Sequence, residues 1–209
     1  MNGTAGGVVR SRVKFCTAGL RWGRVMVFFQ AMSKRVLCLL VDGFEETETV
    51  TPVNLMRRGG IEVVMASLRG GVVEGRGGIR IEPDEDFEDI APGTFDLLYL
   101  PGGPGVMDLL DDGRAAKLAA EFHKAGKPVA AICAAPLILQ AAGLLENRRF
   151  TAHFSVHGEL PGVVDERVVE DGLILTSRGP GTAVDFGLAL LRKLAGDKVA
   201  QEVAEGIMA

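Results

Sequence analysis

The stretch RVLCLLVDGFEETETVTPVNLMRR, residues 35–58, decides the fold class because it changes from a strand pattern to a helix pattern. Residues 35–41 are almost continuously apolar, which predicts a parallel strand covered on both faces. From Glu45 to Arg58 apolar residues recur at near-helical spacing, and acidic side chains crowd the first turn, where the helix dipole favours them. Gly59 and Gly60 end this predicted helix.

The same alternation of strand and helix patterns continues to the end of the chain. We expect further strands at 62–67, 95–100 and 128–132 and near Val168 and Ile174, a small hairpin from 72–73 and 79–81, and helices at 114–124, 133–142, 183–194 and 198–207. Parallel neighbours need crossover connections, and helices usually supply them. The pattern therefore predicts an α/β fold, a doubly wound sandwich with a mainly parallel central sheet.

The first residues differ in composition from the rest of the 209-residue chain, whose length suits one domain. Residues 1–32 contain five basic residues and no acidic one, which is typical of a mitochondrial transit peptide. Met32 directly precedes the first strand pattern, so residues 1–31 could instead come from an over-extended gene start. We favour the second interpretation, and we expect a disordered extension at 1–32 and a single domain at 33–209.

Charge and composition exclude several functional classes. The net charge is −4 although residues 1–32 are basic, so the remainder is acidic and no nucleic-acid partner is expected. Cys16, Cys38 and Cys133 form neither a disulfide framework nor a metal-binding pattern, which favours the cytoplasm. No apolar run approaches the roughly 18 residues of a membrane span. The motifs of nucleotide binding and zinc proteases are missing, so we predict chemistry without cofactor or metal.

Cys133 is the first candidate for a reactive group. It directly follows the predicted strand 128–132, and the small residues on either side of it let a helix turn sharply away from a strand. This pattern predicts a nucleophile elbow, in which the helix N-terminus lowers the pKa of the thiol. The alternative is a buried, inert cysteine, which is the interpretation we give to Cys38 in the middle of a strand.

Other candidate residues are expected at the same edge of the sheet, because ligands bind beyond the carboxyl ends of parallel strands. Backbone amides of Gly102 and Gly103 could stabilise an oxyanion, although such a segment can also be a simple turn. Glu48 could share a proton with the thiol, or it could be a solvated residue at a helix start. His153 and His157 follow a strand predicted to begin at Phe150, and spacing does not choose between them.

Four motifs occur in order: Glu45-Glu-Thr-Glu-Thr-Val50 with Arg57-Arg58-Gly59, Leu100-Pro-Gly-Gly103, Ala130-Ala-Ile-Cys-Ala-Ala-Pro136, and Leu175-Thr-Ser-Arg-Gly-Pro-Gly-Thr182. Together they resemble the ThiJ/PfpI superfamily from about residue 34 onward, and above all the branch of the parkinsonism-associated protein deglycase and its bacterial relatives. The resemblance implies a flavodoxin-like fold and a homodimer. It also implies that Cys133 is an oxidisable nucleophile bound to Glu48, that Gly103 and the amide of Ala134 hold an oxyanion, and that His153 is the pocket histidine.

The activities attributed to this superfamily compete with one another. They include glyoxalase III, which converts methylglyoxal to lactate, deglycation of early adducts, chaperone action and oxidative-stress sensing. We therefore expect a cysteine enzyme that acts on small α-oxoaldehydes or glycated substrates, with a redox sensor or redox-regulated chaperone as the main alternative and a cysteine protease or amidase as the third. Two residues depart from the pattern: Asn54 stands where relatives often carry aspartate, and Glu82 where the best-known member has a second redox-active cysteine.

Overall fold

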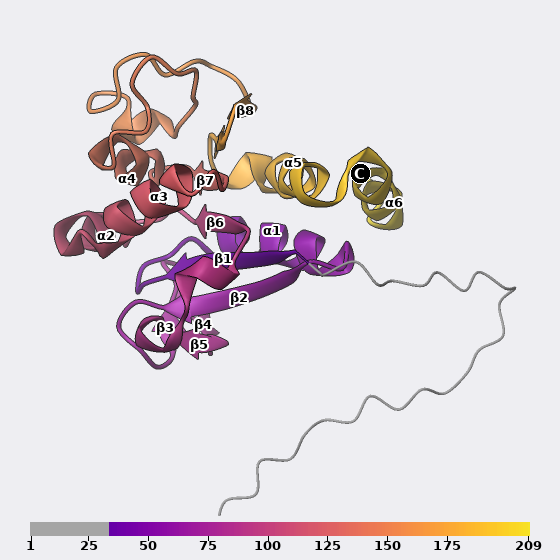
Figure 1. Cartoon of the computed structure of the whole chain (residues 1–209), viewed down its shortest axis with the longest axis horizontal. Helices are drawn as coiled ribbons and strands as arrows, with labels where there is room; N and C mark the ends of the chain where they lie inside the picture. Colours follow the sequence, from indigo (N-terminus) through magenta and orange to yellow (C-terminus); the bar gives the residue numbers. More distant parts are fainter. Residues whose placement is uncertain (1–33) are drawn as a thin grey trace, which may run out of the picture. The chain divides into compact units, whose positions relative to one another are not determined.

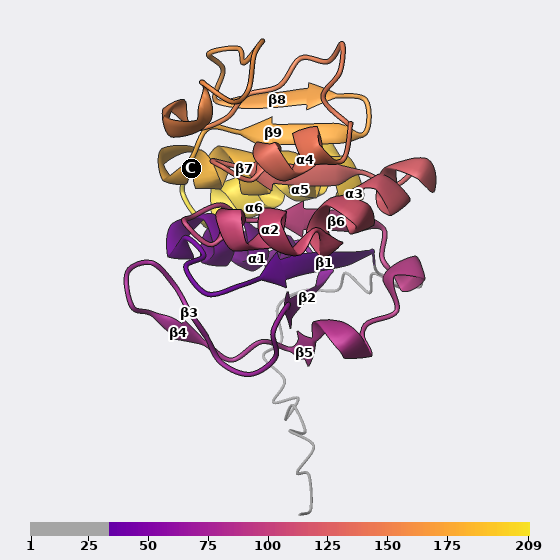
Figure 2. The ribbon, with the colours of Figure 1, turned by 90° about the vertical axis from the view of Figure 1, so that its left-hand side faces the viewer.

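A computed structural model of the protein describes residues 34–209, which form a seven-stranded sheet covered by helices on both faces (Figure 1; Figure 2). The strand order is β5-β2-β1-β6-β7-β9-β8. Only β8 and β9 pair antiparallel among these neighbours. The strands are β1 Arg35–Leu40, β2 Glu62–Ser67, β5 Glu85–Asp86, β6 Leu97–Leu100, β7 Val129–Ile132, β8 Val168–Asp171 and β9 Ile174–Ser177. The predicted α/β class with a mainly parallel sheet is confirmed.

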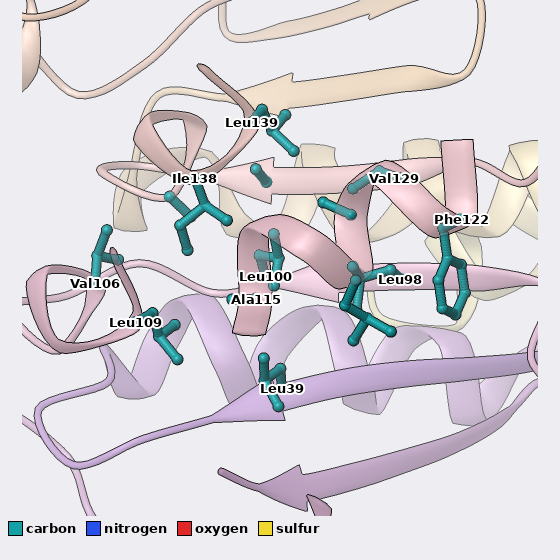
Figure 3. Close-up of a cluster of buried hydrophobic side chains, with 14 of the residues drawn as sticks. Leu39, Leu98, Leu100, Val106, Leu109, Ala115, Phe122, Val129, Ile138 and Leu139 are labelled. Carbon is teal, nitrogen blue, oxygen red and sulfur yellow. The ribbon is translucent and has the colours of Figure 1, made fainter. Parts of the chain in front are cut away.

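Helices form one layer on each face of the sheet (Figure 2). One layer contains α1 Glu46–Arg58, α5 Ala183–Ala195 and α6 Asp197–Gly206, and the other contains α2 Val106–Asp112, α3 Arg114–Lys124 and α4 Pro136–Ala141. A separate apolar cluster lies under each layer. Figure 3 shows part of the cluster under α2, α3 and α4, where Leu98 and Leu100 of β6 lie among side chains of the covering helices.

The continuous apolar pattern of β1 is explained by these two clusters. Leu37 and Leu39 belong to the cluster under α2, α3 and α4, whereas Val36, Cys38 and Leu40 belong to the cluster under α1, α5 and α6. Both faces of the strand are therefore covered, as expected for a central parallel strand. Cys38 is completely buried, and this burial raises the pKa of its thiol well above the ordinary value. The structure agrees with the prediction of an inert core cysteine.

A hairpin lies outside the main sheet and contacts the loop after β1. It consists of β3 Val73–Glu74 and β4 Arg80–Ile81, which pair antiparallel as the sequence predicted. The amide of Gly43 donates to the carbonyl of Glu74 at 2.8 Å, and the amide of Arg76 donates to the carbonyl of Phe44 at 2.8 Å. These bonds hold the hairpin against the carboxyl edge of the sheet.

The prediction of a strand beginning at Phe150 is wrong. Residues 150–153 form no strand, and the amide of Thr151 donates to the side-chain oxygen of Thr176 at 2.9 Å. The reason is topological: β9 already pairs with β7 on one side and β8 on the other, so it has no free edge. The helix predicted from residue 133 begins later, at Pro136, because residues 133–135 form a turn. Helix α2 was not predicted, since a glycine-rich segment precedes it.

The predicted extension at 1–32 and residue 33 lie outside the described residues. Among the helices that the structure describes, none combines the length and apolarity needed to cross a bilayer.

Helices α1 and α5 approach so closely that Gly187 on α5 has no room for a side chain. A Cβ atom there would lie 2.7 Å from Cδ1 of Leu55 and 3.0 Å from Cα of Pro52. Helix propensity alone would make Gly187→Ala stabilising by about 1 kcal/mol. We expect the opposite sign, a loss of about 1–3 kcal/mol in the free energy of unfolding, because overpacking at a backbone contact outweighs propensity.

Urea unfolding followed by circular dichroism measures this change. Gly206→Ala in α6 is the control, because a Cβ at that position meets no atom within 4 Å. The control should be neutral or slightly stabilising. If Gly187→Ala is as stable as the control, the two helices do not pack this closely.

Candidate active site

Three loops meet where strands β1, β6 and β7 end. The chain leaves β1 toward β2 on one side and returns to β6 on the other, so a topological switch point lies between β1 and β6. Glu48 comes from the first turn of α1 after β1, Gly102 and Gly103 follow β6, and Cys133 follows β7. The fold therefore brings Glu48 and Cys133 together although they lie more than 80 positions apart in the sequence.

Cys133 occupies a strained turn between β7 and α4. Its φ is +65°, a left-handed conformation that costs a non-glycine residue about 1–3 kcal/mol. Two bonds hold this backbone in place: its amide donates to the carbonyl of Ser177 at 2.9 Å, and its carbonyl accepts from the amide of His153 at 2.8 Å. The side chain is 8% exposed. The amides of Gly103 and Ala134, the expected oxyanion donors, lower the pKa of this thiol by hydrogen bonding.

Glu48 is completely buried, so the interpretation as a solvated residue at a helix start is wrong. Its Oε2 accepts from the amide of Gly102 at 3.0 Å, and hydrogen bonding by the neighbouring Cys133 thiol lowers the pKa of its carboxyl. Its amide donates to Oε2 of Glu45, the N-cap of α1, at 2.7 Å. Oε1 has no partner among the described residues. A buried carboxyl with one unpartnered oxygen beside a thiol is poised to exchange a proton.

Pro52 and Tyr99 explain why the backbone of Glu48 stays in place. Pro52 lies inside α1 and has no N–H to donate to the carbonyl of Glu48, four residues earlier. The hydroxyl of Tyr99, on the neighbouring strand β6, donates to that carbonyl instead. A side chain of the sheet thus replaces the missing helix bond at the residue whose carboxyl faces Cys133.

Gly102 lets the carboxyl and the thiol approach each other. A Cβ at this position would lie 2.5 Å from Oε2 of Glu48 and 2.6 Å from Cβ of Cys133. The amide of Gly102 is bonded to Glu48. Gly102 and Gly103 were predicted as a pair of oxyanion donors, but of the two it is the Gly103 amide that lowers the pKa of the Cys133 thiol by hydrogen bonding.

Burial raises the pKa of both members of the pair. It raises the pKa of Glu48 to about 7, and the charge of Glu45 adds to this, whereas hydrogen bonds from Cys133 and Gly102 oppose it. Burial also raises the pKa of Cys133 to about 12, and the charge of Glu48 adds to this. The predicted lowering of the thiol pKa is therefore wrong in net direction, because the two amides oppose a larger desolvation effect. A thiolate forms most readily when Glu48 is protonated.

A cavity of about 290 Å³ opens over the thiol. His153 lines it, with Nδ1 2.9 Å from Oγ of Ser155, and burial lowers the pKa of the imidazole. His157 does not line this cavity, and its Nε2 lies 3.2 Å from the carbonyl oxygen of Ala152. The structure thus selects His153 over His157 as a neighbour of Cys133.

Several cavity residues were missed by the sequence analysis, and two of them carry large side chains from other elements. Arg76 comes from the loop of the β3–β4 hairpin, and Met107 comes from α2. Neither belongs to a motif that indicates chemistry, and their positions depend on how the hairpin and α2 meet the sheet. Within residues 34–209 no group of three or more His, Cys, Asp or Glu side chains is arranged to hold a metal ion.

The comparison with known families agrees with this geometry. The DJ-1/PfpI family model matches residues 34–193. The chain belongs to the DJ-1/PfpI family. Protein dj-1beta of Drosophila melanogaster is 37% identical to this DJ-1/PfpI protein over 183 residues, which are 85% of this chain and 98% of the relative. A deglycase of Pyrococcus abyssi is 39% identical over 151 residues, covering 70% of this chain and 91% of the relative.

Solved structures lead to the same family. The crystal structure of Drosophila melanogaster DJ-1beta superposes on this DJ-1/PfpI protein with a TM-score of 0.82 and 36% identity. The superposition covers 85% of this chain and 99% of that one.

The raised pKa of Glu48 makes the stability of the fold pH-dependent. Its proton is bound more tightly in the folded chain, at a pKa of about 7 against an ordinary 4.5. The stabilisation is complete below about pH 4.5 and is lost as the pH rises through 7, by roughly 3 kcal/mol. We expect Glu48→Gln, which stays neutral, to remove this decline.

Urea unfolding at several pH values between about 4.5 and 8.5 tests the expectation, with the exposed Glu121→Gln as control. The control should follow the wild-type curve. Parallel pH curves for all three proteins would show that Glu48 titrates alike in the folded and unfolded chain.

Proposed function

We propose that this protein is a cofactor-independent cysteine enzyme that acts on α-oxoaldehydes such as methylglyoxal or on their early glycation adducts. The observation that carries the proposal is the buried pair of Cys133 and Glu48, of which Cys133 lines a cavity together with Gly103 and Ala134, whose amides lower the pKa of the thiol. The deglycase names of relatives in Pyrococcus abyssi and Pyrococcus furiosus support carbonyl adducts as the substrate class.

The first step is addition of Cys133 to the aldehyde carbon. The sulfur–carbon bond forms as the carbonyl π bond breaks, and the thiol proton reaches the new hydroxyl oxygen through Glu48. While negative charge develops on that oxygen, the amides of Gly103 and Ala134 stabilise it. A protonated Glu48 favours this step because it places no charge beside the forming thiolate.

The second step is an internal redox exchange between the two former carbonyl carbons. Glu48 removes the proton from the carbon bound to sulfur, and a proton returns to the neighbouring carbon, so the first carbon is oxidised and the second reduced. The product is a lactoyl thioester, which water hydrolyses to lactate while the thiol is regenerated. A pKa of about 7 lets Glu48 act as both base and acid near neutral pH. His153 lines the same cavity and is placed to assist proton transfer at the substrate oxygens.

Lactate formation from methylglyoxal, without glutathione, tests this mechanism. Cys133→Ser should reduce lactate to the background rate, and Glu48→Gln should lower kcat by at least about 100-fold, the usual contribution of a general acid–base group. Cys38→Ala is the control, because this thiol lies in the core and does not line the cavity. Lactate production that persists in Cys133→Ser would sink the glyoxalase mechanism.

A second comparison separates direct deglycation from removal of free aldehyde. Methylglyoxal equilibrates with its adducts, so preformed adducts should be presented after free methylglyoxal has been scavenged. Adduct loss that still depends on Cys133 supports deglycation, whereas adduct loss that vanishes with scavenging supports action on the free aldehyde.

The two alternative functions depend on the same cysteine. In a redox sensor or redox-regulated chaperone, Cys133 would be oxidised to a sulfinic acid that accepts a hydrogen bond from protonated Glu48. A related structure from Toxoplasma gondii, at 29% identity, is that of an oxidised DJ-1, and this supports the redox alternative. A cysteine protease needs a carboxylate that orients the histidine, and within residues 34–209 the ring of His153 is bonded to Ser155 and to no carboxylate.

We also propose that the chain forms a homodimer, as its resemblance to the superfamily implies. Helices α1 and α5 pack side by side, and each leaves an apolar side chain exposed, Val50 and Val184. Light scattering after gel filtration should give twice the chain mass of 22.2 kDa, and the pair Val50→Glu and Val184→Glu should lower that mass. A monomeric wild-type protein at micromolar concentration would contradict the proposal.

A further inference from the structure

The β3–β4 hairpin places an arginine at the mouth of the Cys133 cavity. Arg76 lines the cavity together with Cys133, Ala134 and His153. Within residues 34–209 its guanidinium makes no hydrogen bond and no ion pair to another side chain. By contrast, Arg80 on the same hairpin is paired with Glu74 at 2.9 Å. An unpaired guanidinium beside a reactive thiol is available to a ligand.

The backbone around Arg76 is fixed although its side chain is exposed. Its amide donates to the carbonyl of Phe44 at 2.8 Å, and the next amide, of Gly77, donates to Oε1 of Glu46 at 2.6 Å. Gly75 lies so close that a Cβ there would be 2.4 Å from the same oxygen of Glu46. Because Glu46 and Phe44 belong to the chain segment that leads to Glu48, the hairpin loop and the catalytic pair are held by one segment.

The electrostatics of the cavity favour an anion. Among the described residues that line it there is no carboxylate, and Arg76 is the one of them that is charged at every accessible pH. The charge of Arg76 reaches the site, since it contributes to lowering the pKa of both Glu48 and His153. Glu48, with a pKa of about 7, is partly neutral under physiological conditions and so opposes an anion less than an ordinary glutamate would.

We propose that Arg76 binds a carboxylate of the substrate, and that the preferred substrates are α-oxoaldehydes that carry a carboxylate beyond the two carbonyl carbons. A guanidinium matches a carboxylate with two parallel hydrogen bonds. A cavity of about 290 Å³ has room for a four- or five-carbon molecule of this kind. The choice of substrate rests on the proposed function, whereas the anion site itself does not.

Alkylation of Cys133 tests the anion site without any turnover. Iodoacetate and iodoacetamide have nearly the same shape, and each loses iodide as the sulfur forms a thioether, but only iodoacetate carries a negative charge. The ratio of their rate constants at Cys133, measured by peptide mass spectrometry, should fall about fivefold in Arg76→Gln. Arg80→Gln is the matched control and should keep the wild-type ratio, and Arg76→Lys should keep most of it.

Two features make this readout specific. The iodoacetamide rate alone reports whether each variant is folded with an accessible thiol, and salt at about 0.5 M should shrink the wild-type preference because it screens an exposed charge. If the ratio is the same in Arg76→Gln and Arg80→Gln, Arg76 does not bind anions and the inference is overturned.

Turnover then tests the substrate class. We expect 4,5-dioxopentanoate, which would yield 2-hydroxyglutarate, to have a several-fold lower KM than its neutral methyl ester, and Arg76→Gln to abolish that difference. Equal KM values for acid and ester in the wild-type protein overturn the substrate assignment and leave the glyoxalase mechanism standing. If neither compound nor methylglyoxal is converted, the proposed function fails, and the alkylation ratio still decides whether Arg76 forms an anion site.

Discussion

The site depends on one constraint, which is that within residues 34–209 the buried carboxyl of Glu48 has no ion-pair partner. Glu48 is removed from water, and its carboxyl is met by the amide of Gly102 and the thiol of Cys133 where a cation would usually stand. Such a group keeps its proton to higher pH than an exposed glutamate, because burial penalises the charged form. The pair formed with Cys133 therefore stores a mobile proton near neutral pH, and this property links the fold to the proposed chemistry.

The backbone is adapted to bring this pair together. Pro52 removes one helix bond at Glu48, and the Tyr99 hydroxyl bonds the same carbonyl from the sheet, which ties α1 to β6 at this residue. Gly102 has no side chain, so carboxyl and thiol can lie on either side of it. Cys133 accepts an unfavourable φ because its own N–H and C=O are both bonded to neighbouring segments. Without the surrounding contacts, each of these features would destabilise the fold locally.

Much of this arrangement could be predicted from the sequence. Buried apolar strands alternating with helices indicated the sheet, and the small residues around Cys133 indicated a sharp turn after β7. The site prediction was weaker where distant groups decide the outcome. The sequence predicted a lowered thiol pKa because Cys133 precedes a helix N-terminus. In the structure, burial and Glu48 raise this pKa more than the amides of Gly103 and Ala134 lower it. No sequence motif indicated a role for Arg76, because only the packing of the hairpin against the sheet brings this residue to the cavity.

The sequence by itself determined the class of fold, the position of Cys133 at a strand end and the family, because these depend on local periodicity and on the order of motifs. Only the tertiary structure decided that Glu48 is buried, that Gly102 serves the carboxyl, and that His153 rather than His157 faces the thiol. It also decided that residues 150–153 are not a strand, since β9 has no free edge. Burial, close approach and edge pairing are properties of segments far apart in the chain, and no local pattern contains them.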